Sequence, residues 1–137
     1  MEFEKRIPND YEPLEEVFQK ATDILASIQE HRHYLETSSK EDLLECWKNN
    51  LEDFLNEWSI VKNVEIKETY SFKATWNEIK SKLSLIKTNG QFLLTKDSKT
   101  VLEAIEDNLK LFTLNIPRIP DEIETNRQLK NDKRWIE

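Results

Sequence analysis

Glycine is almost absent from this chain, which has a single glycine, Gly90, among 137 residues, and only four prolines. Sandwiches and barrels of β-strands need many tight turns with positive φ angles, which glycine adopts at little cost. A chain that turns so seldom is better suited to long helices with few connections. The composition therefore favours a helical fold over an all-β fold.

Cysteine and long hydrophobic runs are also scarce. Cys46 is the only cysteine, so the chain cannot form the internal disulfides on which small secreted domains usually depend. No apolar stretch has the length of a signal peptide or of a membrane span. From these absences we expect a cytoplasmic protein without a membrane partner.

Basic side chains are outnumbered by acidic ones, 20 against 27, which gives a formal net charge of -7. Direct binding to nucleic acid or to anionic lipid depends on a basic surface, so this balance argues against both. It permits a basic protein as the partner. The length of 137 residues suits a single domain.

Apolar residues, by contrast, recur every three or four positions along most of the chain, which is the spacing of an amphipathic helix. The pattern predicts an all-α bundle of about four main helices, at 13–36, 39–62, 71–88 and 98–114. In the first of them the apolar stripe consists of Leu14, Phe18, Ala21, Leu25, Ile28 and Leu35. Trp47, Trp58 and Trp76 fall on the stripes of the later helices, which predicts that they belong to the core.

The segments outside the helices divide the chain into an N-terminal arm at 1–12, a bundle domain at 13–115 and a C-terminal tail at 116–137. The tail begins with Ile116-Pro117-Arg118-Ile119-Pro120. Since a residue that precedes proline disfavours the helical region, this stretch predicts an extended hinge. Beyond the hinge we expect either a short helix around 121–130 or a loosely ordered segment.

Short motifs mark where some helices begin. Ser38 and Glu41 have the spacing of a capping box at the start of the second helix. Asp97 or Ser98 can cap the fourth helix. The segment 63–71 is compatible with a continued helix, a new helix or a short strand.

The dipeptide Asn89-Gly90 supports two interpretations. Gly90 can form a left-handed cap after a helix that ends near residue 88, with Phe92 folding back onto the last turn. Asn-Gly is also a strong hairpin signal, so that 82–96 becomes a pair of strands in an α+β alternative. The helical spacing from Phe72 onwards favours the cap.

Residues that could carry catalysis or bind metal are few. His31 and His33 point about 200° apart on a helix, so they cannot share a metal ion, and we expect His31 to pack at the edge of the core. Cys46 lies beside acidic residues and next to Trp47, which favours a buried structural thiol over a nucleophile. With one glycine the chain cannot form a phosphate-binding loop. We therefore predict no enzyme activity, no metal site and no cofactor.

The residues best suited to bind a partner are acidic. The second predicted helix carries Glu41, Asp42, Glu45, Glu52 and Asp53, and the first carries Glu16, Asp23 and Glu30. Carboxylates fixed on rigid helices match a basic protein surface, and inhibitors and immunity-type proteins mask their targets in this general way. The sequence thus predicts a non-catalytic protein-binding module.

Trp135 is the candidate that fits none of the stripes. It ends a basic segment of the tail and can anchor that segment on a partner or on the protein itself. Together with the apolar segment 92–94 it defines the alternative function, a structural or assembly subunit that self-associates. The oligomeric state is left open by the sequence.

Overall fold

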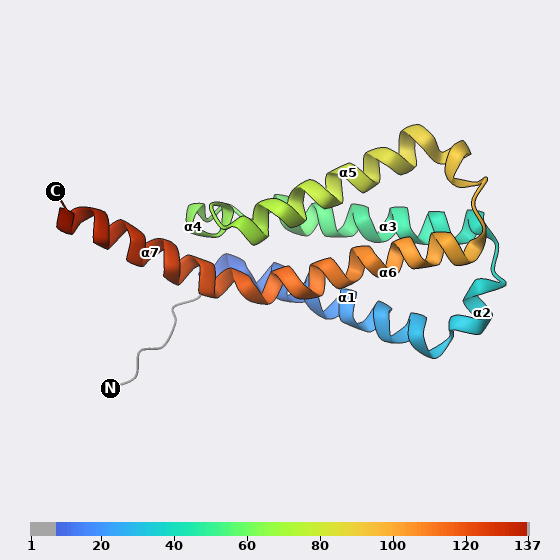
Figure 1. Cartoon of the computed structure of the whole chain (residues 1–137), viewed down its shortest axis with the longest axis horizontal. Coiled ribbons are helices and arrows are strands. Elements are labelled where there is room, and N and C mark those ends of the chain that lie inside the picture. The colour runs from blue at the N-terminus through green and yellow to red at the C-terminus, as the bar shows by residue number, and fades with distance from the viewer. Residues whose placement is uncertain (1–7, 137) are drawn as a thin grey trace.

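The computed structural model describes residues 8–136, with side chains as far as Asn131. Four long helices run alternately up and down: α1 (Glu12–Glu30), α3 (Lys40–Ser59), α5 (Tyr70–Leu93) and α6 (Ser98–Asn115) (Figure 1). The predicted all-α bundle is therefore confirmed. The α+β alternative is wrong, because the described part of the chain contains no strand and residues 82–93 are helical.

The four long helices occupy the corners of the bundle. Both α1 and α5 pack against α3 and against α6, and α3 also contacts α6 through the centre. As a result α1 and α5 lie in opposite corners (Figure 1). The first two long helices, α1 and α3, run in opposite directions and are therefore antiparallel (Figure 1).

The core contains the side chains that the apolar stripes predicted. Leu14, Val17 and Ala21 of α1 are fully buried, and Trp47 and Trp58 of α3 are almost so. Trp76 is only partly buried and packs against the edge of this core. Removing a large apolar side chain from water contributes about 1.5–3 kcal/mol, so these stripes supply the main stabilising force of the bundle.

The first predicted helix is interrupted. α1 ends at Glu30, His31 adopts φ -112° and ψ 24°, and a short helix α2 (Arg32–Glu36) follows in a new direction. The change of direction brings Arg32 against α6, where its guanidinium donates to the carboxylate of Glu106, while its Nε donates to Glu36 at 3.0 Å.

The start of α3 lies one residue later than the capping box predicted. Ser39, not Ser38, is the N-cap, and its Oγ accepts a hydrogen bond from the backbone N–H of Asp42 at 3.1 Å. Ser38 is held elsewhere, since its carbonyl accepts from the hydroxyl of Ser98 at 2.7 Å. At the start of α6 the prediction is confirmed, because Asp97 accepts from the N–H of Thr100 at 2.7 Å.

The ambiguous segment 63–71 forms a new helix. Asn63 caps the short α4 (Val64–Lys67), and Thr69 then caps α5 by accepting from the N–H of Phe72 at 3.2 Å. Each of these polar side chains satisfies a backbone N–H that lacks a partner at the start of a helix. The two caps in quick succession explain why no single period describes this stretch.

Gly90 does not end a helix. Neither Gly90 nor any other described residue has a positive φ angle, so the expected left-handed cap is wrong. Instead α5 kinks at Asn89, with φ -123° and ψ 28°, and continues to Leu93. The extra turn lets Leu93 and Leu94 pack against the core, whereas the side chain of Phe92 remains 59% exposed.

The C-terminal region is helical where an extended hinge was expected. A 3-10 turn (Ile116–Arg118) leads directly into α7 (Ile119–Ile136), which continues past the end of the bundle (Figure 1). Pro117 and Pro120 stand in first turns, where the missing N–H has no consequence. Ile116 and Ile119, which precede these prolines, have αR backbone angles, and their burial outweighs the preference of such residues for an extended conformation.

The start of the described chain is fixed to this C-terminal region. A 3-10 turn (Asn9–Tyr11) precedes α1, and the buried hydroxyl of Tyr11 donates to the carbonyl of Ile116 at 2.8 Å. Residues 1–7 of the predicted N-terminal arm lie outside the described residues. No helix in the described range combines the length and the hydrophobicity that crossing a membrane requires.

Candidate protein-binding surface

Charge is distributed unevenly over the corners of the bundle. α1 carries five acidic side chains and one basic one, and the neighbouring α3 carries six acidic and two basic. α5, in the corner opposite α1, carries four lysines and one glutamate. Acidic residues are therefore concentrated on α1 and α3, and basic residues on α5, which we call the basic corner.

On α1 the predicted acidic residues form a single row. Glu16, Asp23 and Glu30 are all exposed, and they follow one another at intervals of seven residues. Seven residues are almost two full helical turns, so the three carboxylates lie along one line, about 10 Å apart. This row faces away from the core residues Leu14 and Val17.

On α3 the five predicted residues form two rows instead of one. Glu41, Glu45 and Glu52 border grooves between α3 and α5. Asp42 and Asp53 each follow a glutamate of this row, so they lie about 100° further around the helix. Asp53 still lines the groove beside Glu52, and it also approaches Lys20 of α1. The structure thus brings the five carboxylates onto one helix but does not gather them into one cluster.

Lysines from the neighbouring helices neutralise part of this surface. The Nζ of Lys87 on α5 lies 3.8 Å from a carboxylate oxygen of Glu52, and the Nζ of Lys20 on α1 lies 3.9 Å from one of Asp53. The exposed carboxylates at the other end of α3 are Glu41, Asp42 and Glu45. These three, with the row on α1, form what we call the acidic side.

The N-terminal position of Glu41 and Asp42 has a structural use as well. Both stand in the first turn of α3, where negative side chains interact favourably with the helix dipole. That interaction is worth about 0.3–1 kcal/mol for an exposed residue. Glu45 lies beyond the first turn, and the row on α1 extends along the whole helix, so the dipole does not account for them.

Trp135, the remaining predicted partner-binding residue, lies near the end of α7, and its side chain falls outside the described residues. Its placement on the bundle or on a partner therefore stays a prediction. The end of α7 is far from Glu41, Asp42 and Glu45, because α3 begins at one end of the bundle and α7 extends past the other (Figure 1).

The polar side chains of α7 hold this helix on the bundle. Arg127 donates to both carboxylate oxygens of Glu65 on α4, at 2.5 and 2.7 Å, and Lys130 reaches Glu68 at 3.5 Å. The hydrogen bond from Arg127 lowers the pKa of Glu65 and, reciprocally, Glu65 raises the pKa of Arg127. The sequence did not indicate that Arg127 pairs with Glu65, because the two residues lie 62 positions apart.

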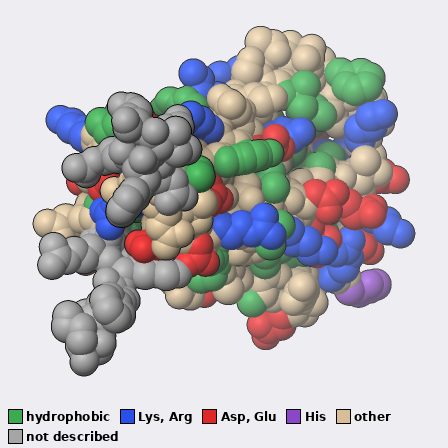
Figure 2. Space-filling model, turned by 60° about the vertical axis from the view of Figure 1, so that its left-hand side comes forward, with side chains coloured by type: hydrophobic (Ala, Val, Ile, Leu, Met, Phe, Trp, Pro, Cys, Tyr) green, Lys and Arg blue, Asp and Glu red, His purple; other side chains and the backbone are tan. Residues whose placement is uncertain are grey.

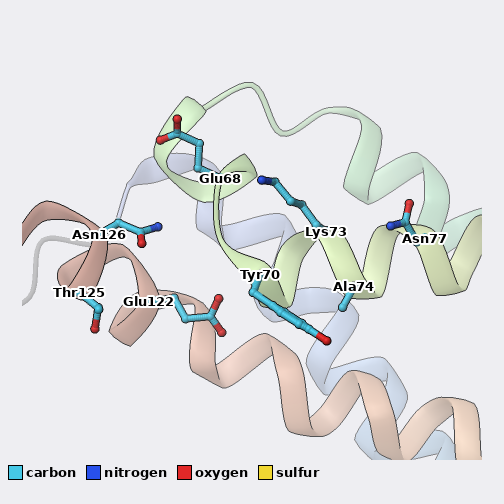
Figure 3. Close-up of a pocket in the computed structure, with 8 residues that line it drawn as sticks. All are labelled: Glu68, Tyr70, Lys73, Ala74, Asn77, Glu122, Thr125 and Asn126. Atoms are coloured by element: carbon cyan, nitrogen blue, oxygen red, sulfur yellow. The ribbon is translucent and has the colours of Figure 1, made fainter. Parts of the chain in front are cut away.

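An open groove of about 610 Å³ lies between α5 and α7 (Figure 3). Tyr70 and Lys73 form its α5 wall, and Glu122 and Asn126 form its α7 wall. Glu122 accepts a hydrogen bond from the backbone N–H of Ser71 at 2.9 Å and another from the hydroxyl of Ser71. Its carboxylate thus joins α7 to the start of α5, which is a structural role.

Two expectations about single residues are wrong. Cys46 is exposed, not buried, because it lies between Asp42 and Asn49 on the outer surface of α3. His31 is exposed too, since the break after Glu30 turns it away from the core stripe. Among the described residues no three His, Cys, Asp or Glu side chains are grouped closely enough to hold a metal ion.

A scan against protein-family models and searches of curated proteins and of solved structures all returned no match.

Proposed function

We propose that this chain is a non-catalytic protein-binding module that presents the acidic side of α1 and α3 to a basic surface of another protein. The supporting observation is the uneven charge of the bundle, with acidic residues concentrated on two neighbouring helices and lysines on α5 in the opposite corner from α1. An inhibitor or immunity-type role follows, in which the module masks the basic surface of its target.

Carboxylates on helices suit this role because the backbone that carries them is already ordered. Binding then requires little additional ordering beyond the side chains themselves. An acidic surface also attracts a basic partner at distances beyond direct contact, which raises the association rate. Salt screens this attraction over about 10 Å at 0.1 M ionic strength, so the interaction should weaken as salt increases.

A capture experiment with matched variants tests the proposal. The tagged protein is incubated with an extract of its native host beside two variants, Asp42→Asn/Glu45→Gln on α3 and Glu103→Gln/Asp107→Asn on α6. All four residues are exposed, and each variant loses two negative charges. We expect the wild type and the α6 variant to retain the same basic protein, and the α3 variant to retain at least about fivefold less of it.

Three outcomes of the capture experiment would contradict the proposal. Equal retention by all three proteins would show that α3 is not the contact, and retention that salt leaves unchanged would exclude masking by charge. A captured protein that is itself acidic would contradict the idea in a third way. Thermal unfolding of both variants serves as the folding control.

The alternative, a self-associating assembly subunit, has weaker support. The segment 92–94 and α7 lie at opposite ends of the bundle (Figure 1), and of that segment Phe92 alone is exposed. On the face seen in Figure 2 the hydrophobic side chains form small separate groups among charged ones. Sedimentation velocity over a range of concentrations distinguishes the two functions, because assembly predicts a concentration-dependent dimer that salt does not dissociate.

A further inference from the structure

A cleft lined by aromatic residues lies on the basic corner, between the end of α3 and the start of α5. It has a volume of about 490 Å³, which is within the usual range for sites that hold small molecules. Trp58, Phe72 and Trp76 supply aromatic lining, and Lys67 and Lys73 supply positive charge. None of these residues belongs to the acidic side.

The three aromatic rings are arranged in a row. The centroids of Trp58 and Phe72 are 5.2 Å apart with an interplanar angle of 17°, and those of Phe72 and Trp76 are 6.4 Å apart with an angle of 8°. Trp58 and Phe72 are buried. The Nε1–H of Trp58 donates a hydrogen bond to the carbonyl of Phe72 at 3.2 Å, which fixes the Trp58 ring. Trp76, at the outer end of the row, is only partly buried, so a flat apolar group can make contact with it.

Lysines surround this aromatic floor. Lys67 and Lys73 line the cleft, and the Nζ of Lys80 lies 5.4 Å from the centroid of the Trp76 ring. In Figure 3 the side chain of Lys73 extends from α5 toward α4, the helix that ends with Lys67. Like charges around one cleft repel each other, and an anion bound between them relieves that repulsion.

The described residues that line the cleft include no carboxylate. Glu65 and Glu68, the acidic residues of α4 and its end, pair with Arg127 and Lys130 of α7, and Glu68 lines the neighbouring groove between α5 and α7. Glu78 of α5 is engaged by Lys82 at 3.6 Å and by the side-chain amide of Asn108 at 2.8 Å. The cleft therefore combines an apolar aromatic floor with a positive rim.

From this combination we infer that the cleft between α3 and α5 binds a small aromatic anion, whose flat ring packs against Trp76 and whose negative group lies between Lys67 and Lys73. The aromatic floor selects for the ring and the lysine rim for the charge, so a ligand needs both. The site is separate from the acidic side and does not depend on the proposed partner.

Titration with 2-naphthalenesulfonate tests this inference, followed by the indole N–H signals in nitrogen-15 NMR spectra. Trp→Phe variants assign the signals. We expect the signal of Trp76 to shift with a dissociation constant below roughly 1 mM, while that of Trp47, buried further along α3, stays in place. Neutral 2-naphthalenemethanol, which keeps the ring without the charge, should bind at least about fivefold more weakly.

Two double variants that lose the same amount of charge then test whether the lysines of the cleft bind the sulfonate. Lys67→Gln/Lys73→Gln should weaken binding of the sulfonate about tenfold, and Lys99→Gln/Lys110→Gln on α6 should leave it unchanged. All four lysines are exposed, so the bundle should fold in both variants. The inference is overturned if Trp76 does not respond, if the neutral analogue binds equally well, or if both variants lose affinity alike.

The same titration on Asp42→Asn/Glu45→Gln separates this inference from the proposed function. These substitutions lie on the acidic side, so sulfonate binding should persist even if capture of a protein partner is lost.

Discussion

At the scale of single residues, Tyr11 joins the start of the described chain to its C-terminal region. Its hydroxyl donates to the carbonyl of Ile116 across 105 positions of sequence, in a buried setting. Tyr11→Phe removes this hydrogen bond and keeps the ring in the core. We expect the free energy of unfolding to fall by about 1 kcal/mol, as urea denaturation near neutral pH can measure. An unchanged midpoint would show that the bond contributes nothing.

The same residue predicts a dependence on alkaline pH. Burial, with a further contribution from Glu15, raises the pKa of Tyr11 from its ordinary value of 10.0 to about 12. The folded state therefore holds the proton more tightly than the unfolded state, so the stabilising contribution is complete below pH 10 and is lost as the pH rises toward 12. The stability difference between wild type and Tyr11→Phe should narrow over this interval. A constant difference would contradict the raised pKa.

Gly90 provides a direct test of where α5 continues. A Cβ atom built on Gly90 meets nothing within 4 Å, and the residue lies within a helix. Gly90→Ala should therefore raise the free energy of unfolding by about 0.5–1 kcal/mol, because alanine has the lower entropy in the unfolded chain and the higher helix propensity. If Gly90 were the left-handed cap that the sequence suggests, the same change would destabilise the protein.

At the scale of elements, the spacing of apolar residues predicted the helices because burial is what stabilises them. The predictions failed at the ends of helices, where local signals compete with tertiary contacts. Ser38 has the capping spacing, yet Ser39 is the cap, and the hydroxyl of Ser38 donates to the carbonyl of Tyr34 instead. Likewise the prolines of the tail are compatible with helix once Ile116 and Ile119 are buried, which sequence spacing does not reveal.

The helix α7 depends on polar contacts beyond its first turns. Ile119 and Ile123 are buried, but further along, Arg127 and Lys130 hold it to α4. Both ion pairs are partly exposed, so each should contribute at most about 0.5–1 kcal/mol. Arg127→Ala should accelerate amide hydrogen exchange at residues 126–131 and leave the first turn around Ile123 protected. Equal acceleration along the whole helix would show that Arg127 stabilises more than this end.

At the scale of the whole molecule, the acidic side could be predicted only in part. The exposure of Glu16, Asp23 and Glu30 followed from their place opposite the apolar stripe. Sequence could not predict that Glu52 pairs with Lys87 and Asp53 with Lys20, because these pairs depend on which helices become neighbours. For the same reason the cleft at Trp76 had no sequence signal beyond an excess of lysines in α5.

In the proposed complex the acidic side of α1 and α3 makes the contact with a basic protein. The most direct test of this contact is the association rate constant of the captured partner, measured by stopped flow at low and at high salt. Asp42→Asn/Glu45→Gln should lower this rate constant about threefold or more at low salt, with little difference at high salt, whereas Glu103→Gln/Asp107→Asn should resemble the wild type. Equal rate constants for the two variants at every salt concentration would contradict the claim.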